Sequence, residues 1–291
     1  MTVDINFVAP QLPTPPKGYD QQSFEQFNNV LRIYFNQLDD ALRNAMAVQE
    51  PYDLQVSKGQ VAGATALYKF GFNPDIDHTE ETIWEQGGNV PWPTAAFTAY
   101  IVSDDAADNG TSTTGAQTVT VQGLDADYNI KSVSVTLNGT TEVAISGTWI
   151  RINRAFVTLS GTGGTAAGTI HIQSSGGGVI YANLNNGNQT QMAVYTVPAG
   201  HTLYLDDINF TAAISAANHS ATVKLVAREF GSNTFRTRFI NVMQSNQHID
   251  KFEYPFVFPE KTDIESRASA TNNNNQIGAS FQGVLIANST V

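Results

Sequence analysis

The segment that decides the fold is QTVTVQGLDADYNIKSVSVTLNGTTEVAIS, residues 117–146. Apolar and polar residues alternate in Val119–Val121 and again in Val133–Val135, with the period of two that is typical of strands. Residues that favour tight turns separate these runs, first in Gly123–Asn129 and then at Asn138-Gly139. Strands and turns at this spacing predict antiparallel hairpins.

The same pattern continues in both directions, from the candidate strand Ala66–Phe72 to the candidate strand Gly278–Ile286. We therefore expect a mainly β protein with two antiparallel β-sandwich domains. The first domain is predicted over residues 51–173 and the second, jelly-roll-like, over residues 179–291. Ser174–Gly178 is predicted to be the linker, because small flexible residues interrupt the strand pattern there. Strands do not alternate with helices, which argues against a Rossmann fold or an α/β barrel.

The composition excludes several classes of function. The 291 residues carry a net charge of −11 and only 14% charged residues, without the basic stripe of a nucleic-acid-binding protein. No apolar run is long enough to cross a membrane. The absence of cysteine excludes disulfides and cysteine-ligated zinc. Met1–Asp4 has neither the basic start nor the apolar core of a signal peptide, so we expect synthesis in a reducing cytoplasm.

Residues 1–18 are predicted to form an extended arm. Prolines recur in this segment and bias the preceding residues away from helix. They are Pro10, Pro13, Pro15 and Pro16. Two interpretations are open, a disordered tail or an arm that orders against a partner surface. In the second, the apolar side chains would dock on the partner. They are Ile5, Phe7, Val8 and Leu12.

Residues 19–50 contain the one long helix that the sequence predicts, over 20–48. Ser23 and Gln26 have the spacing of a capping box. Apolar residues follow at alternating intervals of three and four, which is a heptad pattern. They are Phe24, Phe27, Leu31, Tyr34, Leu38, Ala41 and Ala45. The stripe either packs on the protein's own β domains or self-associates. We expect a homo-oligomer, specifically a trimer, whose interface contains Phe24, Phe27, Leu31, Tyr34 and Leu38.

Three acidic clusters are candidate cation sites, since hard cations bind several oxygen ligands within one loop. We interpret all three as loops, because no metal-binding spacing is complete. After Asp125 and Asp127, for example, Ile130 stands where a calcium loop needs glycine. The clusters are Asp75, Asp77, His78, Glu80 and Glu81; then Asp104, Asp105 and Asp108; then Asp125, Asp127 and Asn129.

The sequence predicts neither a catalytic residue nor a cofactor or metal site. The histidines are scattered, and neither a nucleophile elbow nor a phosphate-binding loop occurs. Trp84, Trp92 and Trp149 could stack on sugar rings if exposed, but a packed core is the commoner role. We therefore expect a protein that is not an enzyme.

Several segments resemble virion proteins of tailed bacteriophages, especially marine and cyanobacterial ones. They cover most of the chain, and they are Leu12–Asp20, Tyr34–Leu38, Ile76–Gly88, Pro91–Pro93, Val119–Asn129, Val135–Thr141, Tyr195–Gly200 and Phe258–Ile264. The resemblance implies a structural protein and no catalytic residues.

On this resemblance we expect an accessory virion protein on the outer head surface, a capsid decoration or cement protein anchored by its arm and helix. The alternative is a tail-associated fibre or adaptor protein that takes part in host attachment. Expected partners are further copies of this chain and either the major capsid protein or the tail machine. The acidic charge argues against a nucleic-acid partner. A carbohydrate-binding or depolymerising protein is a third possibility, although the long repeats of a β-solenoid are missing.

Overall fold

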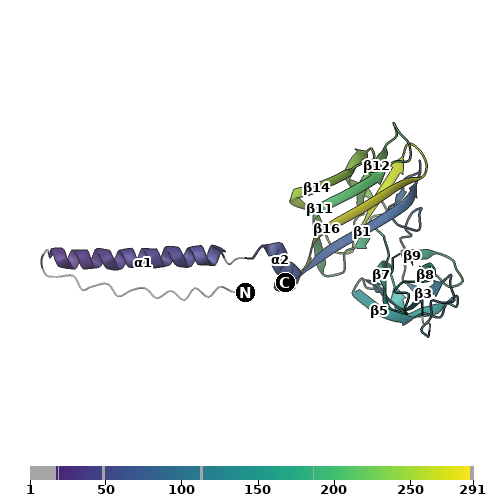
Figure 1. The fold of residues 1–291 in the computed structure, drawn as a ribbon, viewed down its shortest axis with the longest axis horizontal. Coiled ribbons are helices and arrows are strands. Elements are labelled where there is room, and N and C mark those ends of the chain that lie inside the picture. Colours follow the sequence, from purple (N-terminus) through teal and green to yellow (C-terminus); the bar gives the residue numbers. More distant parts are fainter. Residues whose placement is uncertain (1–17, 19, 48–49, 112–113, 186, 289–291) are drawn as a thin grey trace. The chain divides into compact units, whose positions relative to one another are not determined.

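The structure is a computed structural model, and it describes residues 18, 20–47, 50–111, 114–185 and 187–288. The chain divides into two compact units, residues 1–62 and residues 63–291. In the first unit the described regular elements are the helices α1 (Gln21–Ala47) and α2 (Tyr52–Ser57). The second unit contains all the strands (Figure 1). The expected fold class, one N-terminal helix followed by antiparallel sandwiches, is therefore confirmed.

Asp20, not Ser23, caps the N-terminus of α1. Its carboxylate accepts hydrogen bonds from the backbone N–H groups of Gln22 and Ser23, both at 3.2 Å, and from the Ser23 hydroxyl at 2.6 Å. The bond from the Ser23 hydroxyl lowers the pKa of Asp20. The predicted capping box of Ser23 with Gln26 is thus wrong. An aspartate at the cap position satisfies two backbone donors itself and complements the helix dipole.

A four-stranded and a five-stranded sheet form a jelly roll. The first sheet has the order β1-β16-β11-β14 (Figure 1), and the second has the order β10-β15-β12-β13 with β2 also paired to β15. Both sheets are antiparallel, and this strand order is that of a jelly roll. The strands are β1 (Ala64–Ile76), β2 (Glu81–Thr82), β10 (Val194–Thr196), β11 (His201–Ala213), β12 (Ala221–Arg228), β13 (Arg236–Met243), β14 (Gln247–Phe258), β15 (Asp263–Ala270) and β16 (Asn275–Ala287).

The jelly-roll core comes from the alternation that the sequence shows. Along β16, every second side chain from Ile277 to Leu285 faces inward, with Phe281 only 1% exposed. Phe210 of β11 and Phe258 of β14 are equally buried and join the same core. Each such aromatic side chain contributes roughly 1.5–3 kcal/mol on burial.

A second sandwich is inserted between β2 and β10. Its sheets have the orders β6-β3-β8-β9 and β5-β4-β7, and it has its own core around Trp149, Ile101 and Val121. The strands are β3 (Phe97–Ser103), β4 (Ala116–Leu124), β5 (Ile130–Thr136), β6 (Val143–Trp149), β7 (Arg151–Ser160), β8 (Ile170–Gln173) and β9 (Ile180–Leu184). The chain leaves and re-enters the jelly roll at one place, where Trp84 forms a β-bridge with Met192.

The predicted domain boundary is therefore wrong. β1 lies within the expected first domain, residues 51–173, yet it pairs with β16 of the expected second domain, from Ala64 with Ile286 to Ile76 with Asn275. Residues at both ends of the β unit build the jelly roll, and the segment between them forms the inserted sandwich. Pairing between strands so distant in sequence leaves no local pattern, which is why the sequence suggested two consecutive domains.

The predicted linker, Ser174–Gly178, is a turn between the paired strands β8 and β9. Gly176 and Gly177 have φ angles of 75° and 73°, values that favour glycine. Their backbone N–H groups point at the carboxylate of Glu142, with donor–acceptor distances of 3.0 to 3.3 Å, and the bond from Gly176 lowers the pKa of Glu142. The small residues therefore form an anion-binding turn that holds the protein's own carboxylate.

The two sandwiches are joined by a buried ion pair. Arg151 of β7 donates two hydrogen bonds to Asp263 of β15, at 2.8 and 2.9 Å. Arg228 and the Thr196 hydroxyl also donate to Asp263, both at 2.6 Å. Because Asp263 is 3% exposed and Arg151 is 6% exposed, solvent screens this pair little. These contacts thus connect the inserted sandwich directly to the jelly roll.

We predict that Gly71→Ala destabilises the β unit. A Cβ atom on Gly71 would collide with the backbone nitrogen of Ala193 and the backbone oxygen of Ile83, where β1 passes the base of the insertion. Overpacking against backbone costs about 2–3 kcal/mol. Urea denaturation followed by tryptophan fluorescence measures the loss. Gly18→Ala is the control, because a Cβ atom there contacts nothing within 4 Å; an equal effect of both changes contradicts the prediction.

Candidate functional site

The exposed apolar stripe of α1 is the candidate functional site. Among residues 21–42, whose side chains the structure describes, none is buried. Phe24 is 57% exposed, Phe35 is 59% exposed and Leu42 is 48% exposed. Such a stripe on a helix of about 40 Å, at 1.5 Å per residue, is a large exposed apolar surface for a protein.

The heptad residues share one side of α1. Phe27, Leu31, Tyr34 and Leu38 are partly exposed and follow Phe24 along the helix. The opposite side is polar apart from the exposed Ile33, and there Arg32 donates a hydrogen bond to the side-chain oxygen of Asn29 at 3.0 Å. This two-sided pattern is the one with which helices associate.

Some of the predicted site residues lie outside the described part of the chain. The docking residues Ile5, Phe7, Val8 and Leu12 are among them. The prediction of an oligomer interface therefore depends on the residues of α1.

The residues of the first acidic cluster make separate contacts with different partners. Glu80 pairs with Lys224 and with Arg267, while the Glu81 carboxylate accepts the backbone N–H of Gly88. Asp77 accepts the backbone N–H of Asn274 at 2.9 Å. The carboxylates point to different partners. The loop interpretation is wrong for Asp75 and Glu81, because Asp75 lies in β1 and Glu81 lies in β2.

Asp125 closes the hairpin between β4 and β5. Its carboxylate accepts the backbone N–H groups of Asp127 and Asn129, both at 2.9 Å. The resemblance to a calcium loop thus reflects a turn in which the carboxylate takes the place of a backbone acceptor, as predicted.

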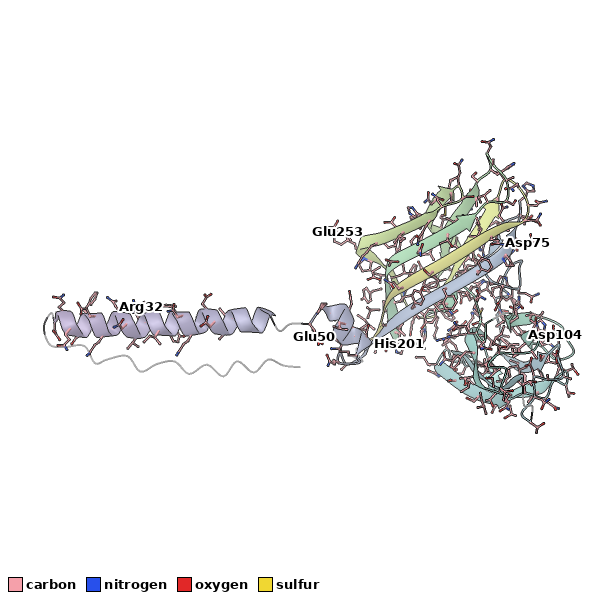
Figure 2. The ribbon with its side chains drawn as sticks, in the orientation of Figure 1. Arg32, Glu50, Asp75, Asp104, His201 and Glu253 are labelled. Carbon is pink, nitrogen blue, oxygen red and sulfur yellow. The ribbon has the colours of Figure 1, made fainter. Side chains whose placement is uncertain are left out.

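Asp108 organises the second cluster, Asp104, Asp105 and Asp108, and is completely buried. It accepts four hydrogen bonds: from the Ser103 hydroxyl at 2.6 Å and from the backbone N–H groups of Ala116, Ala167 and Gly168 at 2.7 to 3.0 Å. It therefore ties three segments of the inserted sandwich together. Asp104, which belongs to this cluster, lies far from Asp75 of the first (Figure 2).

The tryptophans do not form a sugar-stacking surface. Trp84 and Trp149 are 2% and 0% exposed, and Trp84 donates from its ring nitrogen to the Gly88 carbonyl at 3.0 Å. Trp92 lies against the guanidinium groups of Arg151 and Arg228, whose carbons are 5.2 and 5.7 Å from its ring centre. The packed interpretation of Trp84 and Trp149 is confirmed.

Glu85 and Lys69 are two of the buried ionisable groups that were not identified from the sequence. Burial raises the pKa of Glu85 to about 7, although the backbone N–H groups of Gln191 and Asn185 donate to it at 3.1 and 3.3 Å. These bonds connect Glu85, at the start of the insertion, with Asn185 and Gln191 at its end, so the role of Glu85 is structural. Lys69 is the second group, and no pattern around it in β1 distinguishes it from a strand lysine at the surface.

Within the described residues, no three histidine, aspartate or glutamate side chains are grouped so that they could hold a metal ion. None of the described helices is long and apolar enough to cross a membrane. No protein-family model matches the chain. A search of curated proteins gives no significant match. The functional argument therefore depends on the chain's own residues.

We predict that Asp108→Ala lowers the free energy of unfolding by about 3 kcal/mol, because buried donors lose a charged acceptor. Urea denaturation measures this change. Asp127→Ala is the matched control: the side chain is exposed, and the change should cost less than about 0.5 kcal/mol. Equal stability of the Asp108→Ala variant and the unchanged protein contradicts a structural role.

Proposed function

We propose that the protein is a non-enzymatic structural protein of a tailed-phage particle that assembles through α1. The observation that carries the proposal is the apolar stripe, on which Phe24, Leu31 and Leu38 follow one another at heptad spacing with none of them buried. Burying this stripe between copies removes it from water, and water exclusion is the main driving force for association.

A trimer is the proposed assembly. The bulky side chains of Phe24 and Phe27 suit a core of three helices at least as well as one of two. The β unit then occurs three times in each assembly. The resemblance of this sequence to phage virion proteins supports a place on the particle. A capsid decoration or cement protein is the first candidate, with the major capsid protein as partner.

A tail-associated fibre or adaptor protein is the second candidate. The observation that favours it is the division of the chain into a helical unit and a separate β unit. In a fibre or adaptor protein, the helical unit would serve as the anchor and the β unit would contact another surface. Copy number in purified particles distinguishes the two: it follows the number of capsid subunits for a head protein and the symmetry of the tail for a tail protein.

We predict that Leu31→Asp converts the trimer to a monomer, because three carboxylates would meet in an apolar core. Sedimentation equilibrium at micromolar concentration should give three times the chain mass of 31.4 kDa for the unchanged protein and 31.4 kDa for the variant. Asn36→Asp, on the polar side of α1, adds the same charge and should remain trimeric. A monomeric unchanged protein contradicts self-association.

We predict that deleting residues 1–18 leaves the β unit folded but prevents incorporation into particles. The thermal unfolding temperature reports folding, and the protein content of purified particles reports incorporation. Normal incorporation of the shortened chain contradicts a docking arm.

A further inference from the structure

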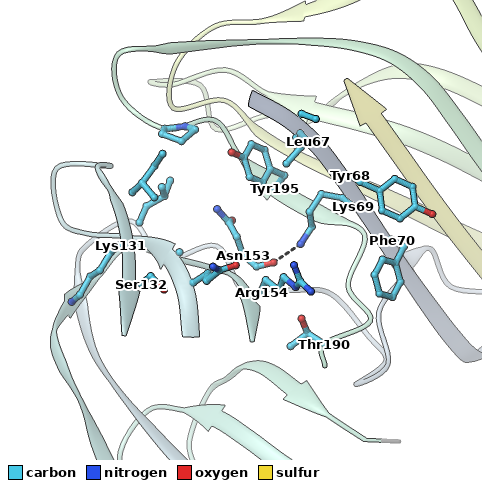
Figure 3. Close-up of a pocket in the computed structure, with 16 residues that line it drawn as sticks. Leu67, Tyr68, Lys69, Phe70, Lys131, Ser132, Asn153, Arg154, Thr190 and Tyr195 are labelled. Atoms are coloured by element: carbon cyan, nitrogen blue, oxygen red, sulfur yellow. Dashed lines mark hydrogen bonds between the residues drawn. The ribbon is translucent and has the colours of Figure 1, made fainter. Parts of the chain in front are cut away.

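A cleft of about 460 Å³ lies between the jelly roll and the inserted sandwich (Figure 3). One wall is β1 around Lys69, and the other comes from β4, β5 and β7. The segment around Thr190 and Tyr195 completes it. The volume is within the range of small-molecule sites, about 300–1,000 Å³.

Lys69 is the unusual residue of this cleft. It occupies an inward position of β1 and is only 7% exposed. Its ammonium group donates to the backbone carbonyl oxygen of Asn153, and it makes no ion pair with any carboxylate in the described residues. One carbonyl leaves two ammonium donors unused, and burying such a group without a counter-ion is costly.

Two further cations share the cleft. Arg154 of β7 lies beside Lys69, and its guanidinium donates to the side-chain oxygen of Gln189 at 3.0 Å (Figure 3). Lys131 of β5 donates to the Thr148 carbonyl at 3.0 Å. Neither cation forms an ion pair with a described carboxylate, and neither aspartate nor glutamate lines the cleft. Lys69 and Arg154 thus lie side by side without an acidic partner in a chain of 26 acidic and 15 basic residues, whereas the Lys131 ammonium is directed away from them towards Thr148 and the Trp149 ring (Figure 3).

The remaining lining is largely apolar. Leu67, Leu124, Ile130 and Pro198 contribute aliphatic surface, and Tyr195 contributes an aromatic ring. A cationic centre with apolar walls is complementary to a molecule with one anionic group and a hydrophobic or ring-shaped body.

We propose that this cleft binds a small organic anion, whose carboxylate or phosphate pairs with Arg154 beside Lys69 and whose body contacts Leu67, Leu124 and Tyr195. The anion supplies a counter-charge for Arg154 and for the protonated form of Lys69, two charges that otherwise repel each other. Because the cleft is built from both sandwiches, the bound molecule also connects them. The proposal is independent of the assembly through α1.

The titration of Lys69 agrees with this geometry. Burial, and secondly the charge of Arg154, lower the pKa of Lys69 to about 7. The other titratable groups that line the cleft are Lys131, whose pKa burial also lowers, and Tyr68 and Tyr195. Burial raises the pKa of Tyr195, so it stays neutral. Near neutral pH, Lys69 therefore has a large fraction of neutral amine, which exposed lysines with a pKa of about 10.4 lack.

Pyridoxal 5′-phosphate tests the proposal, because it joins an anionic group to a ring and an aldehyde. Its aldehyde condenses with a neutral amine to give an imine and water, and cyanoborohydride supplies the hydride that fixes the product as a secondary amine. The full-length protein is treated at pH 7.5 and the labelled lysines are identified by peptide mass spectrometry. Pyridoxal, which lacks the phosphate, is the matched probe.

We predict that labelling of Lys69 by the phosphate probe exceeds labelling by pyridoxal about tenfold, the factor that ~1.4 kcal/mol of charge attraction produces. Excess inorganic phosphate should suppress it. Arg154→Gln should reduce it towards the pyridoxal level, whereas Lys251→Met, on exposed β14, should leave it unchanged.

Two results would overturn the anion site. One is that Lys69 stays unlabelled while exposed lysines react, which means that the cleft does not admit the probe. The other is equal labelling of Lys69 by both probes, unaffected by Arg154→Gln, which means that Lys69 is a reactive amine without an anion site.

Discussion

The antiparallel pairing of β1 with β16 is the interaction on which the β unit depends. It joins Ala64 to Ile286 and so closes the jelly roll from its two ends in sequence. With β1 in place, Ile83 and Ala193 lie next to each other, and their backbone hydrogen bond of 3.1 Å lets the chain form a whole sandwich between them. The same strand carries Lys69 to the cleft. The jelly-roll core, the base of the insertion and the proposed ligand site therefore all depend on β1.

The first unit follows a different constraint. α1 is well capped by Asp20, but an isolated helix gains its stability from packing of its apolar face. Because the stripe from Phe24 to Leu38 has no buried member, self-association is the proposed source of that stability. Assembly and ligand binding are therefore assigned to separate units of the chain.

Local patterns predicted the elements well, because the period of two along a strand and the heptad along α1 are properties of neighbouring residues. They could not predict the insertion, since the partner of β1 is set by the closure of the whole jelly roll. Asp108 illustrates the same limit within a site. Its loop position was predicted, but two of its four donors, the backbone N–H groups of Ala167 and Gly168, come from residues distant in sequence. Lys69 was missed because its burial depends on the contact between two sandwiches.

Disulfide formation tests self-association through α1 most directly, because the chain contains no cysteine. Leu31→Cys and Arg32→Cys place a single thiol on neighbouring positions, one in the stripe and one on the polar side. Under mild oxidation at micromolar concentration, the account predicts rapid covalent dimers for Leu31→Cys within the trimer and few for Arg32→Cys. Equal cross-linking of the two variants, or none in either, would contradict it.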